Sequence, residues 1–298
     1  SCGDSCGVGS AKKVMEGTGM DQMLEEYGVT IVDFNEGSVV PYPQGHTAKE
    51  FFLAKPAQET DALINLCKMK THALERVTGG VKNLYGCISG LHKAKGHTKY
   101  TNADIFARQL IDLNQLIAPR FCVMDGIVAM DGNGPTSGDP VKMNVLLLGN
   151  DPVAIDSVYC HLVHLDPQMV PTNVHGETMG LGTWREENIR LLSEDGEITM
   201  QEAVERFGNP DFNVDRKKQR SNLWNRFNNG FLRYFQKKPY IVTDKCKKCG
   251  VCVEACPVEG KALQFKNGRK QPPVYNYHKC IRCFCCQEMC PHKAIQVK

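Results

Sequence analysis

Residues 246–257 read Cys246-Lys-Lys-Cys249-Gly-Val-Cys252-Val-Glu-Ala-Cys256-Pro257, and residues 280–291 read Cys280-Ile-Arg-Cys283-Phe-Cys-Cys286-Gln-Glu-Met-Cys290-Pro291. With Cys285 left aside, both stretches have two residues between the first and second cysteines, two between the second and third, and three between the third and fourth, which a proline follows. The chain has 15 cysteines, and nine of them lie between Cys246 and Cys290. This clustering argues against thiols that are incidental core residues, and the repeat decides the fold of the C-terminal part.

The repeated spacing resembles that of bacterial ferredoxins with two 4Fe-4S clusters, in which the fourth cysteine of each run binds the other cluster. The resemblance covers residues 241–298. It implies one ligand set for the first cluster, namely Cys246, Cys249, Cys252 and Cys290, and another for the second, namely Cys280, Cys283, Cys286 and Cys256. Disulfide frameworks and zinc ribbons are not built on triplets with a trailing Cys-Pro, so the spacing argues against both.

Strand signals flank these cysteines. Residues 240–242 are expected to pair with residues 294–297, and Asn267-Gly268 predicts a turn between residues 263–265 and 274–277. We therefore expect a small α+β two-cluster ferredoxin-like domain over residues 241–298. Cys285 is surplus to the spacing, and we interpret it as an inert thiol beside a cluster.

Charge is distributed unevenly along the chain. Residues 215–298 contain 19 Lys and Arg against 5 Asp and Glu, whereas residues 1–214 contain 17 against 28. Two oxidised clusters with their thiolates offset about four of the positive charges. The remaining charge suggests a redox partner protein that is acidic, or contact with the acidic first domain. Nucleic acid is not required as an explanation, although basic segments often bind it.

The composition, with 42% hydrophobic and 23% charged residues, is that of a globular protein. The sequence contains no run of about 18 apolar residues, which a membrane-spanning helix needs. Residues 1–10 carry no export signal, so we expect a cytoplasmic protein. A homo-oligomer is compatible with these properties.

Residues 213–240 form a basic and aromatic segment that we interpret as a linker helix. Leu223, Phe227, Phe231 and Tyr234 recur at helical spacing. Two interpretations are open: a helix that contacts a membrane surface or a partner, and a helix that lays its aromatic stripe on one of the protein's own domains. We favour the second.

Residues 1–212 alternate strand and helix signals. Strands are expected at residues 29–34, 62–66, 121–124 and 145–148, and helices at residues 102–117 and 155–164. Such alternation predicts an α/β domain with a mostly parallel sheet. Ligands of these sheets collect beyond the carboxyl ends of the strands.

Several polar motifs fall at these strand ends. They are Lys70-Thr-His72, Gly80-Val-Lys82-Asn83-Leu-Tyr-Gly86, the Asp125-Gly126 loop, and Asp151-Pro-Val-Ala-Ile-Asp156. Their order and spacing resemble the domain-of-unknown-function family number 362 over roughly residues 1–195. Members of that family often carry a C-terminal two-cluster ferredoxin domain. The resemblance implies an iron–sulfur protein of anaerobic metabolism whose reaction is not established.

Four side chains near the glycine-rich loops are candidate catalytic residues: Lys70, His72, Lys82 and Asn83. Cationic donors beside such loops suit a carboxylate or phosphate substrate.

Four further thiols suggest a third metal centre. The family usually has proline where this chain has Cys6 and Cys67, and Cys2 and Cys87 lie on loops of the same predicted sheet edge. We hypothesise that these four residues bind an iron–sulfur or other metal centre. The alternative is that they are small buried residues. Cys122 and Cys160 lie in apolar runs and are interpreted as core residues.

Two functions are consistent with these patterns. In the first, the protein is a ferredoxin-dependent oxidoreductase that passes single electrons through two 4Fe-4S clusters to or from the α/β domain, which holds the third centre or an anionic substrate. In the second, it is a non-enzymatic ferredoxin-like subunit that docks to a larger redox complex. The sequence contains no dinucleotide-binding fingerprint, no phosphate-binding loop of nucleotide hydrolases and no Gly-x-Ser-x-Gly elbow.

Overall fold

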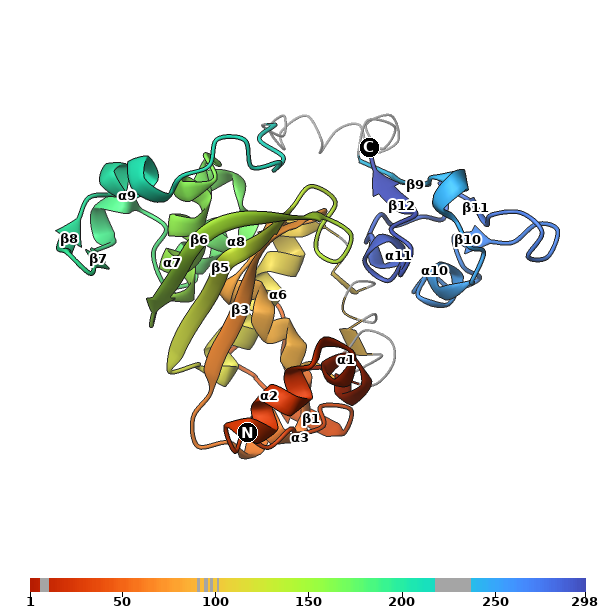
Figure 1. Ribbon diagram of the computed structural model, residues 1–298. Helices are drawn as coiled ribbons and strands as arrows, with labels where there is room; N and C mark the ends of the chain where they lie inside the picture. Colours follow the sequence, from red (N-terminus) through yellow and green to blue (C-terminus); the bar gives the residue numbers. More distant parts are fainter. Residues whose placement is uncertain (6–10, 90–91, 94–95, 97–98, 101, 218–236) are drawn as a thin grey trace.

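The computed structural model describes residues 1–5, 11–89, 92–93, 96, 99–100, 102–217 and 237–298 (Figure 1). Most of the predicted linker helix, including its aromatic stripe, lies outside the described residues. The remainder forms an N-terminal α/β domain and a C-terminal module of residues 239–298. Figure 1 shows the two side by side, with helix α11 of the module on the side that faces the first domain.

The central sheet of the first domain has four strands in the order β4 (Arg76–Thr78), β3 (Ile64–His72), β5 (Phe121–Asp131) and β6 (Asp139–Gly149). Only β3 and β5 are parallel, whereas β4 pairs with β3, and β6 with β5, in antiparallel fashion. The expectation of a mostly parallel sheet is therefore wrong. The reason is connection length: short hairpin loops join β3 to β4 and β5 to β6, and only the longer segment through helix α6 (Ala103–Ile117) permits a parallel crossover.

Strand boundaries also differ from the prediction. The strand expected at residues 29–34 is reduced to an isolated bridge between Ile31 and Cys2. The strand expected at residues 62–66 is β3, which continues to His72 because its second half pairs with both β4 and β5. Lys70 and His72 therefore lie within a strand and not on the loop after it.

Two hydrophobic clusters support the first domain. One lies between the sheet and helices α7 (Pro152–Leu162) and α9 (Met200–Phe207), and it includes Phe212. The other surrounds α6 and the hairpin of β1 (Gly37–Pro41) and β2 (Glu50–Ala54). Helix α6 begins where the Asn102 side chain accepts a hydrogen bond from the amide of Ile105, and it packs against α8 (Pro171–Thr178).

Short elements complete the domain. They are α1 (Ala11–Thr18), α2 (Met20–Glu26), α3 (Lys55–Glu59), α4 (Gly80–Asn83), β7 (Leu191–Ser193) and β8 (Gly196–Ile198). Apolar side chains on the open side of the sheet stay accessible: Ile64, Leu66 and Leu148 each retain more than half of their surface. Helices α7 and α9 thus cover only one face of the sheet.

The C-terminal module contains two small antiparallel ribbons and two one-turn helices. Strands β9 (Pro239–Ile241) and β12 (Ile295–Val297) pair, as do β10 (Leu263–Gln264) and β11 (Val274–Tyr275). Both pairings were predicted from the sequence. Helices α10 (Val251–Glu254) and α11 (Cys285–Glu288) each follow a residue with left-handed backbone, Gly250 and Phe284. The module is therefore an internal repeat in structure as well as in sequence.

Candidate functional site

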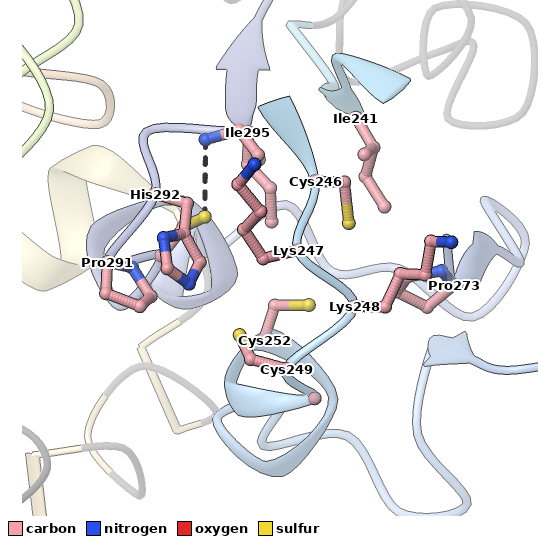
Figure 2. A pocket seen from close by; sticks show the side chains of 13 residues that line it. Ile241, Cys246, Lys247, Lys248, Cys249, Cys252, Pro273, Pro291, His292 and Ile295 are labelled. Atoms are coloured by element: carbon pink, nitrogen blue, oxygen red, sulfur yellow. Dashed lines mark hydrogen bonds between the residues drawn. The ribbon is translucent and has the colours of Figure 1, made fainter. Parts of the chain in front are cut away.

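Four thiols line a cavity in the module (Figure 2). They belong to Cys246, Cys249, Cys252 and Cys290. The first three come from one tight loop, and Cys290 reaches the cavity from the second cysteine run. This is the set that the spacing predicts for the first cluster.

A second cavity is lined by Cys256, Cys280, Cys283 and Cys286. Here Cys256 crosses over from the first run, so the two runs exchange their fourth cysteines. The structure thus brings together each of the two predicted sets of four.

Left-handed residues at equivalent positions turn both loops around their cavities. They are Lys248 and Gly250 in the first loop and Arg282 and Phe284 in the second. A left-handed backbone is costly for residues other than glycine, so a shared pattern of this kind indicates a conformation that the site requires.

Backbone amides are directed at the two exchanged thiols. The amide of Ala294 donates to Cys290 Sγ, and the amide of Ala262 donates to Cys256 Sγ, each at 3.3 Å. Such donors favour negative charge on sulfur and tune the potential of an iron–sulfur cluster.

The donor set fits a cluster better than a single ion. Among the described residues, no three His, Cys, Asp or Glu side chains gather closely enough to hold one metal ion. The four thiols of each set instead stand around a cavity, which is what a cubane requires, and thiolates are the donors that iron–sulfur clusters use.

Cys285 lines neither cavity. Its thiol is buried and hydrogen-bonds to Cys283, which lowers the pKa of Cys283 and raises the pKa of Cys285. Cys285 therefore acts as a donor to a predicted ligand, not as a substitute for it.

The thiols of the hypothesised third centre are not gathered in the part of the chain that the structure describes. Cys67 Sγ lies 3.8 Å from Cys122 Sγ in the cluster beneath the sheet, whereas Cys87 belongs to the cluster around α6. Cys2 pairs through its backbone with Ile31, and Cys6 lies outside the described residues. The third centre stays a prediction.

The module docks on the loop of residues 132–138 between β5 and β6. Gln287 Nε2 donates to the carbonyl oxygens of Asn133 and Gly134 at 2.9 and 3.0 Å, and Thr136 Oγ1 donates to the carbonyl of Glu288 at 2.6 Å. A Cβ atom on Gly134 would lie 2.2 Å from the Thr71 carbonyl oxygen, so only glycine fits there. The loop is thereby held against the end of β3.

His72, at the end of β3, meets the module directly. Its Nε2 lies 3.1 Å from Oε1 of Glu288, which follows Cys286 in the cysteine run. Its Nδ1 accepts hydrogen bonds from the amides of Leu74 and Glu75, so the ring proton resides on Nε2. Burial and the charge of Lys82 lower the pKa of His72 to about 4. A neutral imidazole therefore bridges the two domains.

Two lysines, Lys70 and Lys82, lie close enough to His72 for their charges to lower its pKa. Among the described residues, neither Lys70 nor Lys82 forms a hydrogen bond or ion pair, whereas Lys68 on the same face of β3 pairs with Asp125 at 2.6 Å. Burial, and then the charge of Lys82, lower the pKa of Lys70. Half-buried ammonium groups of like charge are the kind of donors that an anion-binding site uses.

Glu75 is a buried acid at the same end of β3. Neither carboxyl oxygen has a hydrogen-bond partner among the described residues, and burial raises the pKa of this group well above its ordinary value. Burial therefore favours the protonated form of this carboxyl.

Asn83 has a supporting position. Its Nδ2 donates to Asn65 Oδ1 at 2.8 Å and to the Leu66 carbonyl at 2.9 Å, which ties α4 to β3. Asp156, the last residue of the Asp-Pro-Val-Ala-Ile-Asp motif, accepts from the amides of Gly80 and Val81 at 2.6 and 3.1 Å. Burial raises the pKa of Asp156 to about 7. Together these contacts hold the helix that carries Lys82.

Sequence reasoning missed Glu75, Gln287 and Glu288. The two module residues were visible only as spacers between Cys286 and Cys290. An acidic residue in a basic segment is the only sequence signal that marks Glu288.

Comparisons with known proteins divide the chain, as the structure does, into an N-terminal domain and a C-terminal module. A family model described as "Domain of unknown function (DUF362)" matches residues 1–161, and one described as "4Fe-4S dicluster domain" matches residues 238–291. No solved structure matches the chain.

One curated relative is the thylakoid-associated protein sll1697 of Synechocystis sp. (strain ATCC 27184 / PCC 6803 / Kazusa). It is 33% identical over 246 residues, which cover 82% of this chain and 74% of that protein. In the described residues, no helix has both the length and the apolar character needed to cross a bilayer. The expected cytoplasmic location and anaerobic role stay predictions.

Proposed function

This chain belongs to the DUF362 family, and we propose that it passes single electrons between two 4Fe-4S clusters and an anion-binding site on its α/β domain. The match to a 4Fe-4S dicluster domain supports the iron–sulfur electron-transfer role. The two cavities with four thiols each support the number of clusters and their ligands.

The proposed ligand sets are the two that line the cavities: Cys246, Cys249, Cys252 and Cys290, and Cys256, Cys280, Cys283 and Cys286. Bound clusters supply one-electron redox chemistry. The protein supplies the thiolates and the amide donors of Ala262 and Ala294.

The contact of His72 with Glu288 carries the proposal. Glu288 belongs to α11, which also contains Cys286, and His72 ends the strand that contains Lys70. Substrate bound at Lys70 and Lys82 would therefore lie beside the helix that holds a ligand of the second cluster. His72 holds a proton on Nε2 at this boundary, because its Nδ1 accepts from the amides of Leu74 and Glu75.

The α/β domain binds the substrate in this scheme. Lys70 and Lys82 would pair with a carboxylate or phosphate group, because neither has a hydrogen-bond or ion-pair partner among the described residues. Asn83 and Asp156 would keep Lys82 in place through their bonds to β3 and α4.

An anaerobic spectroscopic experiment tests the proposal. The reduced holoprotein is titrated with succinate and with inorganic phosphate while electron paramagnetic resonance follows the clusters. We expect one anion to shift the spectrum or the midpoint potential of wild type, to have no effect on Lys82→Ala, and to retain its effect on the matched Lys68→Ala control. Absence of iron, or the same response in Lys82→Ala as in wild type, would contradict the proposal.

A second candidate function is a docking subunit of a larger redox complex. The observation that favours it is the open face of the sheet, where Ile64, Leu66 and Leu148 are exposed. In that case Leu66→Asp and Leu148→Asp would abolish assembly with the complex, while Lys82→Ala would leave electron transfer unchanged. The reverse result would favour the first function.

A further inference from the structure

We propose that the opening of the first cysteine cavity is the docking site of an acidic one-electron carrier protein. The inference rests on the proposed function in one respect, because it requires a cluster in that cavity. It adds the place where electrons enter or leave the protein and the charge of the partner.

The eight predicted cluster ligands differ in their exposure to solvent. Among the eight predicted ligands, Cys249 is the exposed one, Cys246 and Cys283 are half-buried, and the other five are buried. Cys249 lines the first cavity together with Lys247 and Lys248 (Figure 2). A carrier at this edge can reach an exposed predicted ligand, whereas the second cavity offers at most the half-buried Cys283.

The C-terminal module has an excess of basic residues. Residues 241–298 contain eleven Lys and Arg and four Asp and Glu, and five of these cations lie on the loop that contains Cys249 and on the loop of residues 265–273. We call them the basic rim: Lys247, Lys248, Lys266, Arg269 and Lys270. In the part of the chain that the structure describes, none of the five forms an ion pair. Their charge is therefore available to a partner.

Contacts between the loop and the cavity hold the rim in position. Residues 265–273 connect β10 to β11 and contain three of the cations and no acid. Lys248 Nζ donates to the Lys270 carbonyl at 2.9 Å, and a side chain at Gly250 would meet the guanidinium of Arg269 at 3.0 Å. Pro273, at the end of the loop, lines the cavity. The loop is thus fastened beside Cys249.

The basic rim lies apart from the residues that contact the α/β domain. The α/β domain contacts the module through Gln287, Glu288, Lys293 and Ile295, none of which belongs to the rim. Figure 1 shows the loop between β10 and β11 on the side of the module that points away from the first domain. A carrier can therefore dock on the rim while α11 stays in contact with the α/β domain.

These observations favour an acidic carrier over a nucleic acid. The cations lie on the loop of the exposed Cys249 and on the loop fastened to it. An exposed cluster ligand serves electron transfer and is not needed to bind the phosphates of a nucleic acid. In the proposed step one electron leaves the reduced carrier and enters the module, so the carrier is oxidised by one electron and the module is reduced by one. No bond is formed or broken.

Stopped-flow kinetics on the anaerobic holoprotein test the proposal, with an acidic flavodoxin in its reduced form as the probe. The test variant is Lys247→Glu/Lys270→Glu, because both side chains are exposed. The control is Lys12→Glu/Lys13→Glu on α1, which changes the net charge equally. We expect the second-order rate constant to fall about tenfold or more in the test variant, and to fall less than about twofold in the control, at low ionic strength.

Two further readouts separate the possible failures. Reduction by dithionite and the iron content should be the same in all three proteins, which shows that the clusters are intact. Equal rate constants in test variant and control, or loss of DNA or anionic-vesicle binding with an unchanged flavodoxin rate, would overturn the docking proposal. A wild-type protein without iron would instead overturn the proposed function.

Discussion

Nε2 of His72 lies 3.1 Å from Oε1 of Glu288, and this contact joins the end of strand β3 to the helix of the second cysteine run. The two residues are 216 positions apart in the sequence. The His72 side chain is completely buried, so the contact is shielded from water and from salt. At this contact the C-terminal module, which would hold the clusters, meets the strand that carries the proposed substrate site.

The pKa of His72 predicts a loss of stability in acid. The folded pKa of about 4 is below the ordinary value of 6.5, so the unfolded chain binds more protons between these two pH values. The stabilisation is complete above pH 6.5 and is lost as the pH falls toward 4, by at most about 3 kcal/mol. The melting temperature of His72→Gln should therefore fall less than that of wild type between pH 7 and pH 5. His278→Gln, an exposed control, should behave like wild type. Equal losses in all three proteins would refute the assignment.

Anion binding should distinguish the lysines of this region. Lys82→Ala and Lys70→Ala should each weaken phosphate or succinate binding by about 1–3 kcal/mol, because each removes a charged donor. Lys68→Ala is the matched control, since its ammonium group already pairs with Asp125. Isothermal titration measures the three affinities. If Lys68→Ala weakened anion binding as much, the loss of affinity would come from the change in net charge and not from a site at Lys70 and Lys82.

Gly134 should be essential for docking of the module. An added methyl group would lie 2.2 Å from the Thr71 carbonyl oxygen, so Gly134→Ala must displace the loop that receives Gln287. We expect a melting temperature several degrees lower and faster proteolysis between the domains, because a cost of about 2 kcal/mol shifts the midpoint by this amount. Gly17→Ala on α1 is the control, since nothing lies within 4 Å of its added Cβ. Similar behaviour of the two variants would contradict the role of the loop.

Iron analysis should decide whether a third centre exists. Two cubanes correspond to about eight iron atoms per chain. Because Cys67 and Cys87 lie in separate hydrophobic clusters, Cys67→Ala/Cys87→Ala should retain the full iron content. Cys290→Ala, which removes a predicted cluster ligand, should lose about half. About twelve iron atoms in wild type, falling to about eight in the double variant, would instead establish the third centre.

The cysteine spacing predicted the module well because its information is local. Each run places three thiols within one tight loop, and the residues that bend it lie between those thiols, such as Gly250 and Phe284. Hairpin pairing of residues 239–241 with 295–297 followed from strand signals at both ends of the module. Short-range geometry of this kind can be read from spacing alone.

The first domain was predicted less well because its pairings are not local. The alternation of apolar segments indicated strands and helices, but not that β6 returns antiparallel to β5 through a seven-residue loop. Pairing with β4 and β5 extends β3 to His72, which turned two expected loop residues into strand residues.

The sequence by itself determined the eight cysteines of the two cavities, the ribbons beside them and the uneven distribution of charge. Only the tertiary structure decided that His72 meets Glu288, that Cys67 faces Cys122 instead of Cys87, and that Asn83 supports α4. The physical reason is that loop geometry depends on neighbouring residues, whereas contacts between distant segments depend on how hydrophobic faces pack. No spacing in the sequence records which faces will pack together.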